Sequence, residues 1–448
     1  MTEKVQKILQ SHIVLSLFLA SSLVNCRESV QLQSLRKTEQ GEVKLAFGSC
    51  YGIFDYKGDI FKTIVQNDPS LWIWLGDAAY TDQVRKAGFT SDNSMPMDYI
   101  KHRFQQTLDD KHYQKLKETS QVIGVWDDHD YGCNDGDQTF SKKDLVRDVF
   151  LDFIGEPNNT ARRLEKGTGI YQDYFYYQDG IKVHVILLDI RYHFDKKTKE
   201  RLGFEQLKWL EKIFKQHSDA NVTLIGMGVQ ALPDRFFITE AMNWKSKKRY
   251  FNLFRKHQKS GVVLLSGDVH FAQFYHTNCK SLTGYNLQEL TSSGMTHHVN
   301  SFFKIAHHFL NYVTPRFWNS TEIYVNFNFA LIKTKVTKEN DVIVTLQVKS
   351  KGDEVVLEKI LSLKNDMNYD KENLRFSQMC EATHAKHKKA LQLNHYLYVI
   401  IQDRPRILYA TLAVIIGLKS LIISLMIKFT GFVFGKLCKP KQKQLKGD

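Results

Sequence analysis

Short apolar runs that each stop at a glycine, aspartate or histidine constrain the fold of this chain more than any other feature. They are VKLAFGSC (43–50), LWIWLGDAAY (71–80), QVIGVWDDHDYG (121–132), KVHVILLDIRY (182–192), NVTLIGMGVQ (221–230) and VVLLSGDVHF (262–271). Such runs are typical of buried strands that lead into polar loops. Helical periodicity lies between them, at 97–119, 141–153 and 204–216. The alternation predicts an α/β fold with both sheet faces covered, and an alternating pattern at 324–363 predicts a closing antiparallel hairpin.

The ends of these predicted strands carry polar side chains, most of them carboxylates and histidines that can bind metal ions. They are Cys50, Asp77, Asp127, Asp128, His129, Asp189, Arg191, Asp268 and His270. In open α/β sheets, the ligand site lies at the carboxyl edge of the strands. One such Asp or His is more often a cap or a turn residue, but grouped carboxylates repel one another unless cations neutralise them. The grouping predicts a two-metal site that holds a phosphate ester and activates water.

Five sequence blocks share their order and spacing with a known family. They are GDAAY (76–80), WDDHDYGCND (126–135), LLDIRY (187–192), SGDVH (266–270) and ELTSSGMTH (289–297). The first is similar to the G-D-x-x-Y motif of metallophosphoesterases, and the others resemble the alkaline phosphatase D (PhoD-like) branch of that superfamily. The resemblance covers roughly residues 43–350. It implies a four-layer α/β/β/α sandwich with metals at the sheet edges, and hydrolysis of phosphomonoesters or phosphodiesters.

The resemblance also implies metal ligands. Asp77 would bridge two ions, because a carboxylate offers two oxygens. Tyr80 would give a phenolate to the more acidic ion, expected to be ferric; the alternative is a packed aromatic side chain. Cys50 stands where the PhoD-like pattern has a cysteine and is a candidate thiolate ligand. The alternative for Cys50 is a structural or disulfide-bonded cysteine.

The resemblance implies further metal ligands and a proton donor. Asp128 would bind metal, and His129 would donate to the phosphoryl oxygen or protonate the leaving group. Asn134 is a further candidate ligand. Asp268 and His270 occupy the G-D-V-H positions where the superfamily has G-H-x-H, and the carboxylate favours a harder cation such as Ca2+. The expected cofactors are Fe3+ with Ca2+, with Zn2+ or Mn2+ as alternatives.

Two further side chains are candidates for contact with the substrate. The planar guanidinium of Arg191 matches phosphate oxygens, which makes it a candidate clamp. An arginine at a strand end is as often an ion-pair partner. His297 is expected to line the pocket, although a surface histidine is almost as common.

Both ends of the chain carry apolar segments. Residues 1–26 contain the run IVLSLFLASSLV (13–24), which predicts a secretory signal peptide, with a short buried helix as the alternative. Residues 405–428 form a predicted transmembrane helix, whose apolar run 407–427 is interrupted by one charge at Lys419. Its alternative is an amphipathic helix lying at the membrane surface. Three sequons, at Asn158, Asn221 and Asn319, are compatible with secretion and glycosylation.

These segments predict a type I membrane protein of the secretory pathway or cell surface. The catalytic domain (41–364) and a juxtamembrane stalk (365–404) would lie in the lumen or outside the cell. The tail (429–448) is rich in lysine and is therefore expected in the cytosol. Cys50, Cys133, Cys279 and Cys380 would then lie in an oxidising compartment that permits one or two disulfides.

Charge and composition exclude other classes. The net charge is +14, but six lysines and one aspartate follow Ile427, and the remaining excess forms no arginine-rich stripe. Nucleic acid is therefore not an expected partner. A mean hydropathy of −0.35 excludes a polytopic membrane protein. A membrane-anchored metallophosphatase is the leading hypothesis. The alternatives are a phosphodiesterase for phospholipid head groups or glycosylphosphatidylinositol-type anchors, and a catalytically silent binding module.

Overall fold

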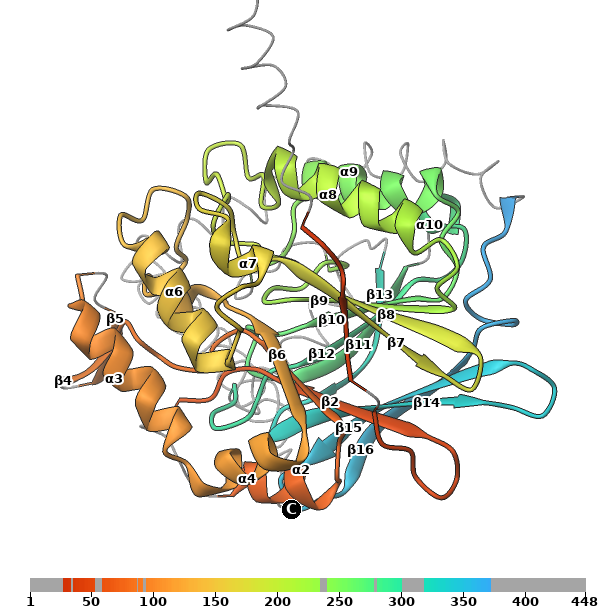
Figure 1. Ribbon diagram of the computed structural model, residues 1–448, viewed down its shortest axis with the longest axis horizontal. Helices are drawn as coiled ribbons and strands as arrows, with labels where there is room; N and C mark the ends of the chain where they lie inside the picture. Colours follow the sequence, from red (N-terminus) through yellow and green to blue (C-terminus); the bar gives the residue numbers. More distant parts are fainter. Residues whose placement is uncertain are drawn as a thin grey trace, which may run out of the picture. The chain divides into compact units, whose positions relative to one another are not determined.

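Two β-sheets form the framework of the fold (Figure 1). The computed structural model describes residues 27–33, 35–52, 59–86, 88–91, 94–233, 240–277, 280–299 and 318–371. All of these residues belong to one compact unit. The residues of a second unit, 236–238 and 389–448, are not among those described. Both sheets contain the apolar runs of the sequence, so the predicted mixed α/β class is confirmed at this level.

The larger sheet has eight strands among the described residues. In spatial order they are β1 (Val30–Gln31), β7 (Gln172–Gln178), β8 (Ile181–Leu187), β9 (Val222–Met227), β10 (Val262–Ser266), β12 (Gln288–Ser292), β11 (Ala272–Thr277) and β13 (Trp318–Tyr324). Strands β8, β9, β10 and β12 are parallel to one another. Their carboxyl ends therefore lie at one edge of the sheet.

The smaller sheet has six strands in the described part of the chain. In spatial order they are β16 (Val355–Ser362), β15 (Val342–Ser350), β14 (Asn328–Val336), β2 (Val43–Gly48), β3 (Leu71–Leu75) and β6 (Gln121–Val125). Strands β2, β3 and β6 are parallel. The segment 324–363 forms the antiparallel meander β14–β15–β16 rather than one hairpin, because a second turn follows β15. A small separate ribbon pairs β4 (Gln83–Lys86) with β5 (Gly88–Ser91).

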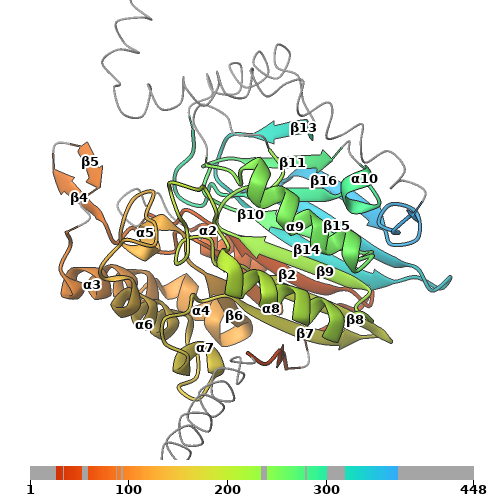
Figure 2. The ribbon, with the colours of Figure 1, turned by 90° about the horizontal axis from the view of Figure 1, so that it is seen from above.

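Helices cover the outer faces of both sheets (Figures 1 and 2). α8 (Gly203–Gln216) and α9 (Trp244–Lys256) cover the larger sheet, and α2 (Ile60–Gln66) and α4 (Lys111–Thr119) cover the smaller one. The shorter or peripheral helices are α3 (Met97–Leu108), α5 (Asp128–Tyr131), α6 (Lys143–Ile154), α7 (Ala161–Leu164) and α10 (Lys280–Thr283).

The inner faces of the two sheets pack directly on each other. A Cβ atom at Gly226 in β9 would lie only 2.6 Å from Leu75 Cδ2 in β3, so glycine permits this close approach. Both residues are buried, and Leu75 belongs to the main hydrophobic core. The order of layers is that of the predicted α/β/β/α sandwich.

Aromatic side chains fill the space between β3 and its covering helices. Trp72 and Trp74 alternate along β3 and thus share one face, with ring centroids 5.2 Å apart. Phe61 of α2 packs on Trp74 at 5.8 Å, and Tyr113 of α4 accepts a hydrogen bond from the Trp74 indole N–H at 2.9 Å. These contacts fix the carboxyl end of β3, from which Asp77 follows.

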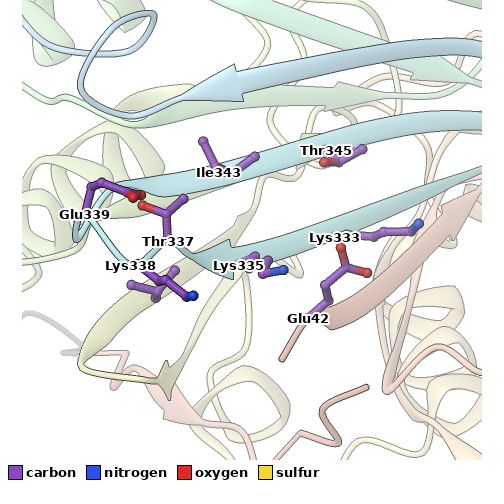
Figure 3. A pocket seen from close by; sticks show the side chains of 9 residues that line it. Glu42, Lys333, Lys335, Thr337, Lys338, Glu339, Ile343 and Thr345 are labelled. Carbon is purple, nitrogen blue, oxygen red and sulfur yellow. The ribbon is translucent and has the colours of Figure 1, made fainter. Parts of the chain in front are cut away.

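A groove lies beside the β14–β15 hairpin (Figure 3). Lys333, Lys335 and Lys338 line it together with Glu42. Lys333 pairs in register with Lys44, at the beginning of β2. The groove is thus at the opposite end of β2 from Cys50.

The predicted terminal segments lie outside the described residues. These are the signal peptide (1–26), the transmembrane helix (405–428), the tail (429–448) and the stalk beyond residue 371. None of the described helices combines the length and apolar character needed to cross a bilayer.

The predicted helix over 97–119 is wrong in one respect, because the chain forms two helices there. α3 ends at Leu108, and Asp110 caps α4 by accepting hydrogen bonds from the backbone N–H groups of His112 and Tyr113, at 2.8 and 2.9 Å. The side chain of an aspartate accepts hydrogen bonds from backbone N–H groups and so favours the start of a new helix over the continuation of the preceding one. Asp109 and Asp110 therefore divide the segment into two helices.

Replacing this cap should lower stability. We expect Asp110→Ala to reduce the free energy of unfolding by about 1–2 kcal/mol, since two amide donors lose their acceptor. Asp109→Ala, at the exposed neighbouring position, should change it by less than about 0.5 kcal/mol. Urea unfolding followed by circular dichroism measures both. Equal effects would contradict the capping role.

Candidate metal centre

The candidate site lies where the parallel strands of both sheets end. The loops after β2, β3, β6 and β10 carry Cys50, Asp77, Asp128, His129, Asp268 and His270. The structure brings these side chains into three overlapping groups, each with ligand atoms within 4.8 Å of one another. Residues more than 200 positions apart in the sequence therefore share one site.

The first group consists of Cys50, Asp77 and His270. Cys50 Sγ lies 3.3 Å from Asp77 Oδ2. The Tyr80 hydroxyl stands 3.4 Å from His270 Nε2 and 2.6 Å from His297 Nε2. The two imidazoles are 3.1 Å apart at their Nε2 atoms. Cys50, Asp77 and Tyr80 therefore lie in one corner of the site, together with His270 and His297.

The second group consists of Asp77, Asp128 and His129. Asp77 belongs to both groups, which places its carboxylate where a bridging ligand would stand. His129 Nδ1 lies 2.8 Å from Asp82 Oδ1, so this carboxylate orients the ring. The backbone N–H of Asp135 donates to Asp128 Oδ2 at 2.7 Å and fixes that side chain.

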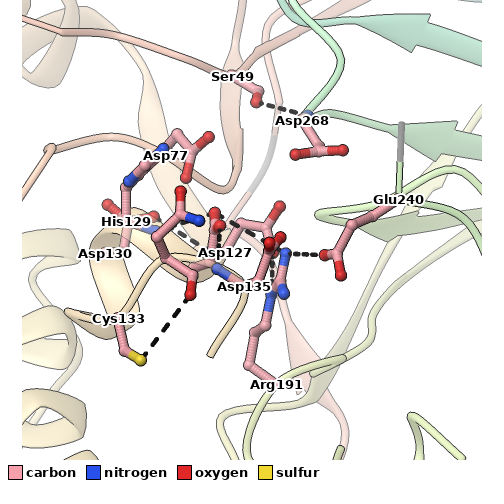
Figure 4. A network of polar contacts seen from close by, with 12 residues as sticks. Ser49, Asp77, Asp127, His129, Asp130, Cys133, Asp135, Arg191, Glu240 and Asp268 are labelled. Carbon is pink, nitrogen blue, oxygen red and sulfur yellow. Dashed lines mark hydrogen bonds and ion pairs between the residues drawn. The ribbon is translucent and has the colours of Figure 1, made fainter. Parts of the chain in front are cut away.

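The third group adds Asp127 and Asp268 to Asp128 (Figure 4). Arg191 lies against it, with Nε 2.5 Å from Asp127 Oδ1 and Nη2 2.6 Å from Glu240 Oε2. The Arg191 side chain is fully buried. Its geometry is that of the ion-pair partner considered above, and its role as a phosphate clamp stays a prediction.

The backbone at the candidate ligands is unusual. Cys50, Asp77, Asp268 and His270 all have positive φ, at 64°, 52°, 73° and 59°. Non-glycine residues seldom occupy this left-handed region, and such residues concentrate at functional sites where the surrounding structure holds them. Gly76 permits the tight turn before Asp77, because a Cβ there would lie 2.3 Å from Asp127 Cβ. The turns thus direct several side chains to one point.

Burial makes the ionised forms of these acids unfavourable. Burial raises the pKa of the Cys50 thiol and of the Asp77 carboxyl well above their ordinary values, and neighbouring carboxylates add to the effect. Burial raises the pKa of Asp127 to about 7 even beside Arg191, and that of Asp268 well above its ordinary value. The site therefore lacks positive charge for its number of acids.

His129 shows the opposite effect. Burial alone would lower its pKa, but the carboxylates of Asp128, Asp82 and Asp77 raise it well above the ordinary value. A protonated imidazole at this position can donate a proton at neutral pH.

The donor set fits metal ions. Asp77 Oδ1 and Asp127 Oδ2 are buried without a hydrogen-bond partner in the described part of the chain. Carboxylate oxygens in this state suit hard cations, and the thiol of Cys50 suits a metal that deprotonates it. Cations would restore the ionised forms that burial disfavours.

Some sequence candidates do not join the three groups. Asn134 is exposed, and the contact to Asp128 comes from the backbone of the next residue, Asp135. Asp189 accepts hydrogen bonds from the backbone N–H groups of Ile170, Arg191 and Tyr192, as expected of a turn residue.

The cysteines and sequons have distinct environments. Cys50 and Cys133 are free thiols, whereas Cys279 and Cys380 lie outside the described residues. Asn158 is exposed in the loop between α6 and α7. The side-chain oxygen of Asn221 accepts a hydrogen bond from the Lys182 amide at 2.8 Å. Asn319 lies in β13, and glycosylation of all three stays a prediction.

The sequence argument missed two carboxylates that hold site residues. Asp82 follows Asp77 by five positions in the same loop, so the loop could have suggested it. Glu240 pairs with both Arg191 and Arg201, yet it lies in no motif that would reveal it.

Comparison with known proteins shows a shared fold. No family model and no curated protein matches the chain. Among solved structures, PhoD matches with a TM-score of 0.51 and 14% identity, over 81% of this chain and 79% of that one. At this identity the likeness shows that the two proteins share a two-sheet α/β fold.

Two further structures are more distant. GAP50, the anchor in the inner membrane complex of Plasmodium, has a TM-score of 0.43 and 12% identity, over 75% of this chain and 93% of that one. A protein described as a 5′-nucleotidase from Staphylococcus aureus, in complex with α-ketoglutarate, has a TM-score of 0.34 and 11% identity, over 76% and 58%. Neither likeness is close enough to carry an argument.

The Asp82–His129 contact generates a pH prediction. Because Asp82 raises the pKa of His129, Asp82→Asn should lower it. If the protonated ring acts as a general acid, the alkaline limb of the kcat/KM profile for phosphate-ester hydrolysis moves to lower pH in the variant. Asp109→Asn, at an exposed site, serves as the control. An alkaline limb that stays in place in Asp82→Asn would contradict this role.

Proposed function

We propose that the protein is a metal-dependent phosphoric ester hydrolase. The observation that carries this proposal is that the three groups of candidate ligands overlap. Asp77 belongs to the first and second groups, and Asp128 belongs to the second and third. Neighbouring cations joined by carboxylates can hold both the attacking and the leaving oxygen of a phosphoryl transfer. The sequence blocks similar to the PhoD-like branch support the same reaction class.

The donor types favour Fe3+ together with Ca2+, with Zn2+ or Mn2+ as alternatives. Cys50 and Tyr80 would face the ferric ion, because burial raises both pKa values and a direct bond to a cation is needed to keep either group ionised. Asp128 and Asp268 offer hard oxygens that suit Ca2+. When bound, the ions would polarise the phosphoryl group and activate water.

The chain's own residues would orient the ester and move protons. Asp82 holds Nδ1 of His129, which leaves Nε2 to protonate the leaving-group oxygen. His297 is neutral, since burial lowers its pKa well below the ordinary value, and it hydrogen-bonds Tyr80 at the rim of the first group. Arg191 would position Asp127, with which it forms an ion pair. To clamp phosphate instead, the Arg191 guanidinium would have to leave its ion pair with Glu240.

The substrate class is proposed as phosphomonoesters or phosphodiesters. A phospholipid or lipid-anchor diester is the second candidate, because the predicted membrane helix would hold the enzyme beside such a substrate. A panel of monoesters, diesters and phospholipids, assayed with iron, calcium, zinc and manganese supplied separately, distinguishes these classes. Absence of bound metal after metal-replete preparation would favour the silent binding module.

The location is proposed from the terminal segments. A signal peptide, a single membrane helix at 405–428 and a basic tail would place the catalytic domain in the lumen or outside the cell. Protease treatment of sealed vesicles should then remove a tail epitope and spare the domain. Protection of both would overturn this topology.

Removing the shared carboxylate should abolish activity. We expect Asp77→Asn to lose at least one metal ion and to lower turnover about a hundredfold or more, because the amide cannot replace a bridging carboxylate. The fold should persist, since it depends on the strands behind the loop. Metal analysis, turnover and circular dichroism test this, with the exposed Asp98→Asn as control. Turnover at the wild-type level in Asp77→Asn would refute the assignment.

Iron bound by phenolate or thiolate should be visible. We expect the iron-loaded protein to show a charge-transfer band, and Cys50→Ser to shift or weaken it because a thiolate ligand is lost. Cys133→Ser, which removes the other free thiol of the described residues, should leave the band unchanged. Absorption spectra of the three proteins test this. A colourless, fully active enzyme would exclude both iron and the Tyr80 phenolate.

A further inference from the structure

A second cluster of metal-binding side chains lies away from the candidate active site. It consists of Asp173 in β7, His184 in β8 and His217, the C-cap residue that follows α8. All three side chains are buried, and their ligand atoms lie within 4.8 Å of one another. Ser29, in the segment before β1, reaches the same point.

The cluster is on the outer face of the larger sheet. Leu187 of β8 pairs in register with Gly226 of β9. A Cβ at Gly226 would point at Leu75 of the opposite sheet, and the Leu187 side chain lies on this same side, with Cδ2 3.1 Å from that Cβ. Leu187 therefore faces inward. Since side chains alternate along a strand, His184 faces outward, toward α8. The loop that carries Arg191 to the candidate active site begins after Leu187, at the carboxyl end of β8.

Four donor atoms converge in this cluster. His184 Nε2 lies 2.8 Å from Asp173 Oδ2, and His217 Nε2 lies 3.5 Å from the same oxygen. Ser29 Oγ is 2.7 Å from His217 Nε2. Donor atoms around a tetrahedral zinc ion, at bonds of about 2.0–2.1 Å, are about 3.3 Å apart. The observed separations bracket that value.

Hydrogen bonding alone leaves this cluster incomplete. Asp173 Oδ1, His184 Nδ1 and His217 Nδ1 are buried and have no hydrogen-bond partner among the described residues. On the side where the groups meet, Asp173 Oδ2, His184 Nε2 and His217 Nε2 face one another. A buried carboxylate beside two imidazoles is a donor set that closed zinc sites use.

The neighbouring lysines have partners of their own. Lys182 Nζ pairs with Asp219 at 2.9 Å, and Lys259 Nζ donates to the backbone carbonyl of His217 at 2.9 Å. Neither ammonium is hydrogen-bonded to the Asp173 carboxylate in the described structure.

We propose that Asp173, His184 and His217 bind a structural zinc ion, with Ser29 at the fourth position. Two imidazoles and one carboxylate favour zinc over Ca2+ or Mg2+, which take oxygen ligands. The ion joins β7, β8 and the end of α8. Through Ser29 it also fastens the segment 27–33, whose strand β1 pairs with β7, to the sheet.

The test separates this site from the active site. In full-length protein carrying Asp77→Asn and Asp268→Asn, each of the three active-site groups lacks a ligand. After zinc loading and removal of excess, we expect about one zinc ion per chain. Adding His217→Gln should remove it. Adding His257→Gln, a matched control at the end of α9, should not.

A second variant covers the outcome in which His217→Gln fails to fold. His217→Cys supplies a thiolate in place of the imidazole, so it should retain the metal and, with Co2+, add a sulfur-to-cobalt charge-transfer band. Zinc should also raise the Tm of the starting protein. Absence of bound zinc in that protein, or a Co2+ spectrum unaffected by His217→Cys, would overturn the proposal. Neither result depends on phosphoesterase activity.

Discussion

Repulsion among buried carboxylates is the constraint on which the site depends. Asp127, Asp128 and Asp268 offer oxygens within 4.8 Å of one another, and the Arg191 guanidinium pairs with Asp127 and Asp128. That single positive charge is shared with Glu240, and burial still raises the pKa of Asp127 to about 7. One arginine therefore does not compensate this group. Although burial acts against it, the neighbouring His129 and Arg191 keep the pKa of Asp128 below its ordinary value. Asp127 and Asp268 are the acids that bound cations would keep ionised at neutral pH.

The sandwich makes such a concentration of charge sustainable. Parallel strands from both sheets end at one place, so the strained turns at Cys50 and Asp268 are held by a large apolar core. Glycines let the loops approach closely: Cβ atoms at Gly76 and Gly228 would lie 2.3 and 2.6 Å from atoms of Asp127. The stability of the layers thus supports an arrangement that the loops alone could not maintain.

The sequence predicted what depends on local pattern. The apolar runs located the parallel strands, and the residues at their ends located the site, because strand polarity alone brings those ends together. The contact between His129 and Asp82 and the pairing of Arg191 with Glu240 could not be predicted, since both depend on how separate loops fold over each other. The division of 97–119 was missed because a helical period says nothing of a capping side chain such as Asp110.

The two clusters differ in charge, and this difference separates their proposed roles. The groups of the candidate site combine several acids with few bases, so under the proposed function they would take more than one cation and could then accept a phosphate. The Asp173 cluster has a single acid with two neutral imidazoles, so one divalent ion leaves a net charge of about +1 and little reason to recruit an anion. It is also closed, since Asp173, His184 and His217 are buried and Ser29 occupies the remaining side. Carboxylates and imidazoles are therefore proposed to hold catalytic metal ions at the strand ends and, in the Asp173 cluster, a structural ion that joins β7, β8 and the end of α8.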